Sequence, residues 1–201
     1  MSLVSLEFLE HDNVVQIAQD LLGCELRHTL ADGTILSGII TETEAYRGPE
    51  DKASHAWNNR RTCRTEIMFG NAGTSYVYLC YGIHNLFNVV TNKSGIPHAV
   101  LIRGIFPILG LDRQLENRNK IKLNYQDFVG PGKVTKALEI TSNHNNINLL
   151  DSNSPLQMHD KFNFSKNDIQ MGKRVGIDYA EDWKDKLWRF WIKKELLKNI
   201  K

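Results

Sequence analysis

A predicted β-hairpin near the start of the chain restricts the possible folds more than any other feature. The segment CELRHTL, residues 24–30, is followed by the turn ADG and then by TILSGIITETEAY, residues 34–46. An Asp-Gly pair between two apolar, β-branched segments is a strong signal for a tight turn between antiparallel strands. We therefore expect an antiparallel sheet, and we exclude an all-helical fold.

Further strands are predicted in the middle of the chain and near its end. TSYVYLC (74–80) and NLFNVVT (85–91) flank the tip YGIHN, and HAVLIRGIF (98–106) follows as the third strand of a meander. The segment DKLWRFWIKKELLKNIK (185–201) has the alternation of a late strand in its first half and becomes a basic tail helix in its second. The polar segments LNYQDFV (123–129) and TSNHNNINLLDSNSP (141–155) are predicted as loops.

Helical patterns lie outside these strands. In NVVQIAQDLLG, residues 13–23, apolar side chains recur at helical spacing, with Asp12 as the expected N-cap and Gly23 as the stop signal. GPGKVTKALEI, residues 130–140, begins with a glycine-proline entry into a second helix. Strands in the middle with helices around them predict the α+β class, as a single compact domain with a curved antiparallel β-sheet core flanked by helices.

Length and composition argue against several classes of protein. The 201 residues, 41% of them hydrophobic, suffice for one sizeable core, so residues 1–201 are treated as one domain. No stretch has the length of a membrane span and the N-terminus has no signal peptide pattern, so we expect a cytoplasmic protein without membrane association. The three cysteines are odd in number and widely spaced, which argues against a disulfide framework. The net charge of +2 does not by itself indicate a polyanionic partner.

Two glutamates stand near the end of the predicted long strand. Because side chains alternate between the two faces of a strand, an apolar row on one face is expected to continue into both acids: Leu36, Gly38, Ile40, Glu42, Glu44 and Tyr46. Burial raises the pKa of a carboxyl group, and a buried carboxylate is retained where it has a partner or a chemical role. The spacing also fits two glutamates that lie beyond the core edge in water.

Three tyrosines lie in the predicted meander and differ in direction. Tyr76 and Tyr78 point to the same face of their strand, and Tyr76 is expected as a core residue with a hydrated hydroxyl. Tyr81 has the other parity and directly precedes Gly82, so it is expected at a hairpin tip. An exposed aromatic side chain there suits a contact with a partner, or a wedge between stacked bases.

Other polar residues leave more than one interpretation open. Arg103 interrupts the apolar segment AVLIRGIF and needs an acidic partner, for which Glu44 is a candidate, in either a structural or a catalytic ion pair. His55 has no second histidine or cysteine at metal-ligand spacing, so no metal site is expected. GPGK, residues 130–133, resembles an anion-binding helix entry, although a plain turn into the helix is the simpler interpretation.

Taken together, five motifs in this order resemble the alkyladenine (3-methyladenine) DNA glycosylase family: TETEAYRGPEDKASHA, MFGNAGTSYVYLCYGIHNLFNVV, AVLIRGIFPILGL, GPGKVTKAL and RVGIDYAEDW. The resemblance covers most of the chain from the first predicted helix to WRFWI. It implies a monofunctional enzyme that flips a damaged purine, such as 3-methyladenine or hypoxanthine, out of duplex DNA. The enzyme then hydrolyses the bond between the purine and deoxyribose, without a metal or a cofactor.

The resemblance also implies roles for individual residues. It makes Glu44 the general base, with Arg103 and the backbone carbonyl of Val175 holding the attacking water. It places Tyr46 and His55 on the two sides of the extruded base, with Tyr78 closing this sandwich. It places Asn88 at the pocket floor, where the side chain crowds the exocyclic amine of guanine. It makes Tyr81 the wedge that fills the stack vacated by the base.

The expected partner is double-stranded DNA that contains damaged purines, bound by a monomer. Glu42 receives no role and is expected to be solvated. Two further hypotheses fit part of the pattern: a catalytically silent damaged-DNA-binding module, and a carbohydrate or nucleoside hydrolase that uses the same carboxylate. The binding module gives no role to Glu44 and Arg103, and the carbohydrate or nucleoside hydrolase gives no role to Tyr81. Cys63 stands where the family often has proline.

Overall fold

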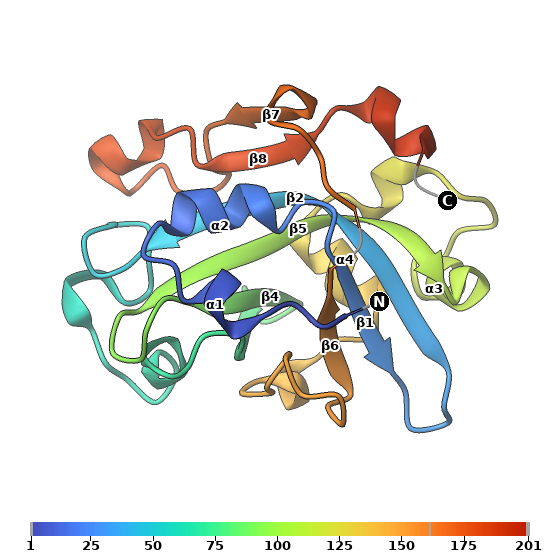
Figure 1. Ribbon diagram of the computed structural model, residues 1–201, viewed down its shortest axis with the longest axis horizontal. Helices are drawn as coiled ribbons and strands as arrows, with labels where there is room; N and C mark the ends of the chain where they lie inside the picture. Colours follow the sequence, from blue (N-terminus) through green and yellow to red (C-terminus); the bar gives the residue numbers. More distant parts are fainter. Residues whose placement is uncertain (1, 161, 200–201) are drawn as a thin grey trace.

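Eight β-strands form one antiparallel sheet in the computed structural model, which describes residues 2–160 and 162–199. The α+β class and the sheet core flanked by helices are as predicted, and Figure 1 shows the long strands curving across the molecule. The strands are β1 (Glu25–Thr29), β2 (Ile35–Arg47), β3 (Ser75–Cys80), β4 (His84–Thr91), β5 (His98–Leu109), β6 (Leu156–His159), β7 (Ile169–Gly172) and β8 (Arg189–Ile192).

Strand β2 is the centre of the sheet. One of its edges pairs with β5, while the other edge pairs with β1 through residues 35–39 and with β8 through residues 42–44. The order along the main path is β3-β4-β5-β2-β1-β6, and β7 joins the sheet through β8. The predicted hairpin and the predicted meander are both confirmed. The second half of β2 therefore lies between β5 and the C-terminal part of the chain.

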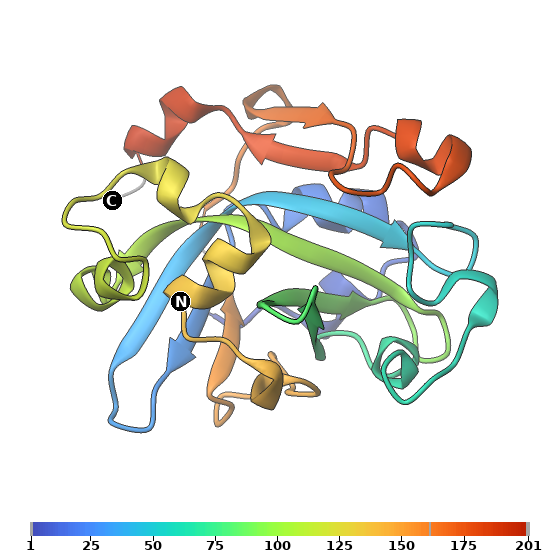
Figure 2. The same cartoon turned by 180° about the vertical axis from the view of Figure 1, so that it is seen from behind.

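The two main packing helices cover opposite faces of the sheet. In Figure 1, α2 (Val14–Asp20) lies in front of β2 and β5, and the reverse view in Figure 2 places α4 (Pro131–Ala137) in front. The predicted apolar stripe of α2 is buried in the core, as expected for an amphipathic helix: Val14, Ile17, Ala18, Leu21 and Leu22. No described helix combines the length and the apolar character that crossing a membrane would require.

The predicted start of α2 is wrong by one residue, and the predicted start of α4 is confirmed. Asn13, rather than Asp12, is the N-cap of α2, because its side-chain oxygen accepts the backbone N–H of Gln16 at 3.2 Å. Gly130 precedes α4 and Pro131 is its first residue, as the glycine-proline motif predicted. The other helices are α1 (Leu6–Leu9), α3 (Leu111–Asn117) and the 3-10 helices η1 (Trp57–Asn59), η2 (Glu66–Phe69), η3 (Tyr125–Phe128), η4 (Ser142–His144), η5 (Lys166–Asp168), η6 (Glu181–Asp185) and η7 (Lys194–Asn199).

Several short elements were not predicted. Strands β6 and β7 have four residues each, and each is held by pairing with a strand that its own sequence does not reveal, β1 and β8 respectively. The predicted loops contain the 3-10 turns η3 and η4. The predicted tail helix is a 3-10 helix as far as Asn199, and residues 200–201 lie outside the described part of the chain.

The pairing of β2 with β5 is irregular where the acidic residues begin. The register shifts on both sides of Glu42, and a Cβ atom on Gly104 would lie 3.0 Å from the Cβ of Glu42 and 3.2 Å from the Oγ1 of Thr41. Two consecutive residues of β2 thus approach the same glycine, so the alternation predicted from Leu36 to Tyr46 is interrupted here. Beyond this bulge, Thr43 donates its hydroxyl to a carbonyl of α2 at 2.6 Å, and its neighbours face away from α2.

Candidate active site

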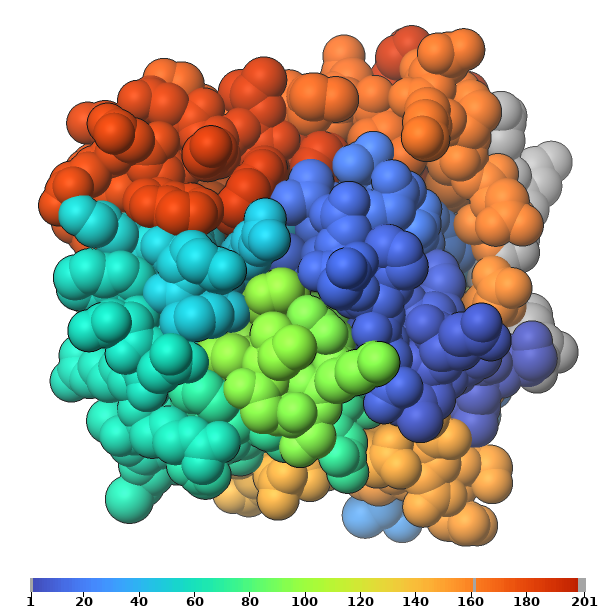
Figure 3. Space-filling model, turned by 60° about the vertical axis from the view of Figure 1, so that its left-hand side comes forward, coloured from blue at the N-terminus to red at the C-terminus, as the bar shows by residue number. Residues whose placement is uncertain are grey.

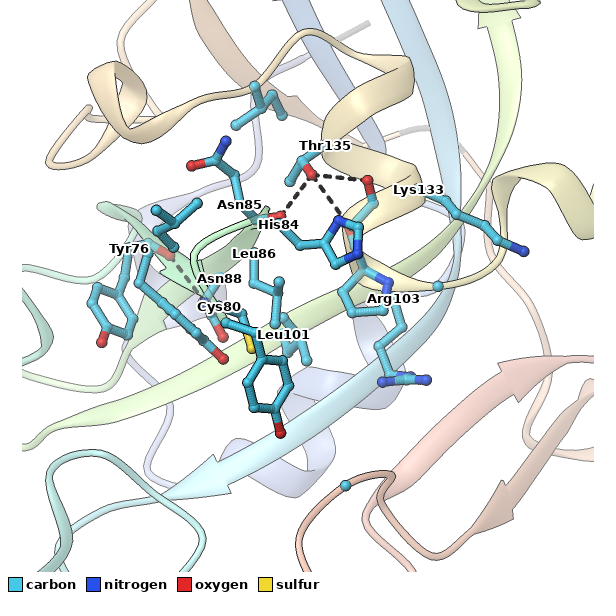
Figure 4. A pocket seen from close by; sticks show the side chains of 18 of the residues that line it. Tyr76, Cys80, His84, Asn85, Leu86, Asn88, Leu101, Arg103, Lys133 and Thr135 are labelled. Atoms are coloured by element: carbon cyan, nitrogen blue, oxygen red, sulfur yellow. Dashed lines mark hydrogen bonds between the residues drawn. The ribbon is translucent and has the colours of Figure 1, made fainter. Parts of the chain in front are cut away.

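A groove of about 1290 Å³ crosses the face of the sheet that carries α4. Figure 4 shows side chains from several elements around it, among them Asn88 of β4, Arg103 of β5 and Lys133 of α4. Glu44 does not line the groove, because its side chain is fully buried behind residues that do. Seven of the eight candidate site residues line the groove: Tyr46, His55, Tyr78, Tyr81, Asn88, Arg103 and Val175.

The carboxylate of Glu44 is held by three groups from different parts of the chain. Its Oε2 accepts the hydroxyl of Tyr46 at 2.8 Å, and its Oε1 accepts the backbone N–H of Val175 at 2.8 Å. The Nε of Arg103 lies 3.4 Å from Oε1. Burial raises the pKa of Glu44, and the three partners oppose that rise because they favour the charged form. Glu44 is therefore a buried carboxyl group on whose pKa burial and its three neighbours act in opposite directions, with burial the larger effect.

The prediction that Glu42 is solvated is wrong. Its side chain is buried, and its Oε1 accepts a hydrogen bond from the Nε of Arg103 at 2.9 Å. The Nε of Arg189, on β8, lies 3.6 Å from the same oxygen. Arg103 thus has two acidic partners, Glu42 at the shorter distance and Glu44 at the longer. The prediction of an acidic partner for Arg103 is confirmed, and the interpretation of both glutamates as hydrated is wrong.

Tyr46 is fixed by a buried ion pair that sequence analysis missed. The guanidinium of Arg174 lies 4.8 Å from the centre of the Tyr46 ring and donates to Asp51 at 3.0 Å through Nη2. Both charged side chains are fully buried, and Arg174 also donates to the carbonyl of Ala45 at 2.9 Å. The only sign of this role in the sequence was that Arg174 directly precedes Val175 in the motif RVGIDYAEDW. This network ties the segment before Val175 to the loop after β2.

His55 and Tyr78 form an aromatic wall of the groove. Their ring centres lie 4.7 Å apart at an interplanar angle of 75°, and the His55 Nδ1 lies 2.8 Å from the hydroxyl of Tyr76. Burial, reinforced by the positive charges of Arg64 and Arg60, lowers the pKa of His55 to about 4. The imidazole is therefore uncharged at neutral pH. Tyr76 is a core residue, as its strand position predicted. Its hydroxyl, expected to be hydrated, has His55 and Arg64 as side-chain partners.

Arg64 is a second residue whose part in the site was missed. Its Nη2 lies 3.0 Å from the Nε2 of His55, and its guanidinium carbon lies 4.7 Å from the centre of the Tyr78 ring. It therefore braces the aromatic wall with a positive charge. The basic cluster RRTCR was visible in the sequence, but nothing there indicated which arginine turns inward.

Tyr81 lies at the exposed tip that its strand context predicted, and Asn88, which the resemblance placed at the pocket floor, lines the groove. Asn88 is buried on β4 and donates its amide to the carbonyl of Tyr76 at 3.0 Å, so its orientation at the groove is fixed. Tyr81 is 89% exposed at the turn between β3 and β4, with a left-handed backbone φ of 51°. Ile83, in the same turn, is 72% exposed. The tip thus presents bulky apolar side chains to solvent, which is unusual without a partner.

Positively charged side chains lie at and near the rim of the groove, and they contact segments that are distant in the sequence. Lys133 donates its Nζ to the carbonyl of Gln126 at 2.9 Å, so the GPGK lysine supports the turn before α4. An ion pair joins Lys52 to Glu181, and Figure 3 shows the segment around residues 50–70 meeting the C-terminal segment along one edge.

Within residues 2–160 and 162–199, no group of histidine, cysteine, aspartate and glutamate side chains is arranged to hold a metal ion.

The chain is similar to known proteins along most of its length. A family model described as methylpurine-DNA glycosylase matches residues 7–196. Among curated proteins, the "Putative 3-methyladenine DNA glycosylase" of Chlamydia felis is 46% identical over 198 residues, which are 96% of this chain and 97% of the relative. The proteins of the same name from Natranaerobius thermophilus and Bacillus cereus are 45% and 42% identical, over 93% and 92% of this chain and 93% of each relative.

The protein is therefore a DNA glycosylase, an enzyme that hydrolyses N-glycosyl bonds in DNA. Within that class, the chain belongs to the methylpurine-DNA glycosylase family. The resemblance inferred from the five sequence motifs is thereby confirmed, and so is a part in DNA repair by base excision.

Proposed function

We propose that this enzyme flips alkylated or deaminated purines, of the 3-methyladenine and hypoxanthine type, out of duplex DNA and hydrolyses their N-glycosidic bond with Glu44 as the general base. One observation carries the proposal: a fully buried carboxylate, paired with Arg103 and hydrogen-bonded by Tyr46 and Val175, lies directly behind an aromatic groove. A buried carboxylate held in this way is suited to take a proton from water and to stabilise a developing positive charge.

The chemistry takes place at the sugar carbon that bears the purine. As the purine leaves, this carbon becomes an oxocarbenium-like centre, which the negative charge of Glu44 stabilises. Water attacks the carbon, its oxygen forms the new bond, and its proton passes to Glu44. Arg103 and the backbone N–H of Val175 contact the same carboxylate. Arg103 and the backbone carbonyl of Val175 orient the water. No amine takes part as a nucleophile, so the enzyme is monofunctional and leaves the DNA strand intact.

The aromatic groove provides the binding energy for an extruded base. Unstacking a nucleotide costs a few kcal/mol, and stacking on an aromatic ring returns about 1–3 kcal/mol per base. Tyr46 and His55, which both line the groove, flank the base, and Tyr78, in contact with His55, closes the sandwich. Because His55 is uncharged at neutral pH, it does not repel a cationic N-alkylated purine. Asn88 limits the floor, where it crowds the exocyclic amine of guanine.

The exposed tip of the β3–β4 turn maintains the distortion of the DNA. Tyr81 enters the space that the flipped nucleotide leaves, in the way that side-chain wedges separate base steps. The substrate is therefore double-stranded DNA, which one copy of the chain, folded as a single domain, engages as a monomer. Arg60 and Arg61 are exposed and Lys133 lines the groove, so these cations are available to contact the phosphates.

A cleavage assay with defined lesions tests the proposal. A duplex with one 3-methyladenine or one hypoxanthine is incubated with excess enzyme, and alkali then converts each abasic site into a strand break. We expect breaks at the lesion alone, at a single-turnover rate well above that of the DNA without enzyme. Tight binding of the lesion without any breaks would instead identify a catalytically silent binding module. Faster hydrolysis of free nucleosides than of duplex DNA would identify a nucleoside hydrolase.

A further inference from the structure

The second buried acid of β2, Glu42, has a defined place beside the catalytic group. Its Oε1 is 2.9 Å from the Nε of Arg103 and 3.6 Å from the Nε of Arg189. Arg103 makes no hydrogen bond through its two terminal nitrogens to any residue within the described ranges, and it lines the groove. Glu42 thus occupies the inner edge of the guanidinium and leaves the outer edge directed at the substrate space.

The backbone is shaped to make this contact. The register between β2 and β5 shifts on both sides of Glu42, and the residue that faces the shift is Gly104, directly after Arg103. A Cβ atom there would lie 3.0 Å from the Cβ of Glu42, which is closer than almost any side chain allows. Glycine at this position therefore lets Glu42 lie against the strand that carries Arg103. A solvated glutamate would need neither the bulge nor the glycine.

We infer that Glu42 is a positioning residue for Arg103, which keeps that guanidinium from closing onto Glu44. Arg103 lies between two carboxylates, and its shorter contact is to Glu42. Without the negative charge of Glu42, the guanidinium gains by moving fully onto Glu44, where it would occupy the position of the attacking water and neutralise the base. This inference rests on the proposed role of Glu44 in hydrolysis.

The electrostatic surroundings predict a particular signature in the pH dependence. The groups that face the pair are Arg103 from β5, Arg189 from β8, Tyr46 from β2 and Tyr125 from η3. The negative charge of Glu42 raises the pKa of Glu44, and the positive charge of Arg103 lowers it. The substitution Glu42→Gln removes this negative charge and lets Arg103 move closer to Glu44. Both changes lower the pKa of Glu44. The acid limb of the excision rate should move to lower pH, while the plateau rate falls.

The test is the single-turnover excision rate as a function of pH for the full chain and its variants on methylated duplex DNA. An N-alkylated purine carries a fixed positive charge, so its leaving does not itself require protonation in this range. For Glu42→Gln we expect a plateau rate lower by about tenfold to a hundredfold, the scale of a misplaced catalytic group, with unchanged binding of the lesion. Glu42→Asp, which keeps the charge, should return the midpoint of the acid limb towards that of the wild type.

Two comparisons separate positioning from a merely structural role. Glu25→Gln removes another buried acid of the same sheet, paired with Arg27 at 3.4 Å, and should leave the midpoint unchanged. In a double-mutant cycle with Arg103→Gln, the loss caused by Glu42→Gln should largely disappear, because the partner through which it acts is absent. Additive losses in the cycle, or a midpoint that Glu42→Gln does not move, would overturn the inference.

The same measurements keep this inference distinct from the proposed function. If the wild-type chain excises the lesion and Glu42→Gln matches it at every pH, then only the positioning role fails. If the wild-type chain excises nothing, the proposed hydrolysis fails and the positioning role fails with it. If Glu42→Gln is too unstable to assay, the Gly104→Ala variant, which crowds the Cβ of Glu42, decides the question through the plateau rate. A wild-type plateau rate in Gly104→Ala would then overturn the inference.

Discussion

Replacing Tyr46 with phenylalanine isolates a single hydrogen bond to the proposed base. The hydroxyl of Tyr46 donates to the Oε2 of Glu44 at 2.8 Å, while the ring forms one wall of the groove, and phenylalanine keeps the ring. A hydrogen bond to a charged acceptor is worth about 1.5–3 kcal/mol. This bond favours the ionised form and lowers the pKa of Glu44, so its loss raises that pKa. A change of one pKa unit corresponds to about 1.4 kcal/mol, so a shift of about one to two units is expected in the pH profile.

The sign of the shift is fixed by the role of the group. A general base must be ionised, so the excision rate rises as the pH passes the pKa of Glu44, and a raised pKa moves this limb to higher pH. The assay is the single-turnover rate of purine release from methylated duplex DNA across the pH range. Tyr125→Phe is the matched control, because it removes a hydroxyl that donates to the Oγ1 of Thr41 at 3.0 Å. An unmoved limb, or one that moves to lower pH, would refute the role of Tyr46 and of Glu44 as a coupled pair.

Three further predictions concern stability and binding. Arg174→Met leaves Asp51 buried without its cation and should cost about 3–5 kcal/mol of unfolding free energy, measured by thermal or urea denaturation. Tyr81→Ala should weaken binding of lesion-containing duplex by about 1–3 kcal/mol in an anisotropy titration and leave the melting temperature unchanged, because the side chain is exposed. Glu44→Gln should raise the melting temperature at pH 8, because the raised pKa of Glu44 means that its ionised form costs stability above that pKa. The gain should shrink as the pH falls below that pKa and vanish near the ordinary pKa of a glutamate in the unfolded chain.

The sheet and the apolar positions of the site could be predicted because their signals are local. The Asp-Gly turn fixed the hairpin, and the parity of Tyr76, Tyr78 and Tyr81 placed two side chains on one strand face and the third at the tip. Strands β6 and β7 could not be predicted in this way, because four residues carry too little periodicity and their partners lie far along the chain. Their existence depends on tertiary pairing rather than on intrinsic preference.

The electrostatic part of the site was less accessible from sequence. The prediction that Glu42 is solvated assumed unbroken alternation along β2, whereas the bulge opposite Gly104 turns this side chain against Arg103. The pairing of Arg174 with Asp51 joins residues that are 123 positions apart, and no local pattern links them. Sequence motifs thus located the strand that carries the proposed base, whereas the partners of that carboxylate could be identified only in the folded structure.

The central claim is that the carboxylate of Glu44 performs the hydrolysis, and one comparison tests it most directly. Wild type and Glu44→Gln are measured side by side for binding of a lesion-containing duplex and for single-turnover release of the purine. The glutamine side chain has nearly the same shape but cannot accept the proton of water. We expect binding within a few fold of the wild type and a loss of excision by about a hundredfold or more, the scale of a lost general base. Normal release of the purine by Glu44→Gln would contradict the account.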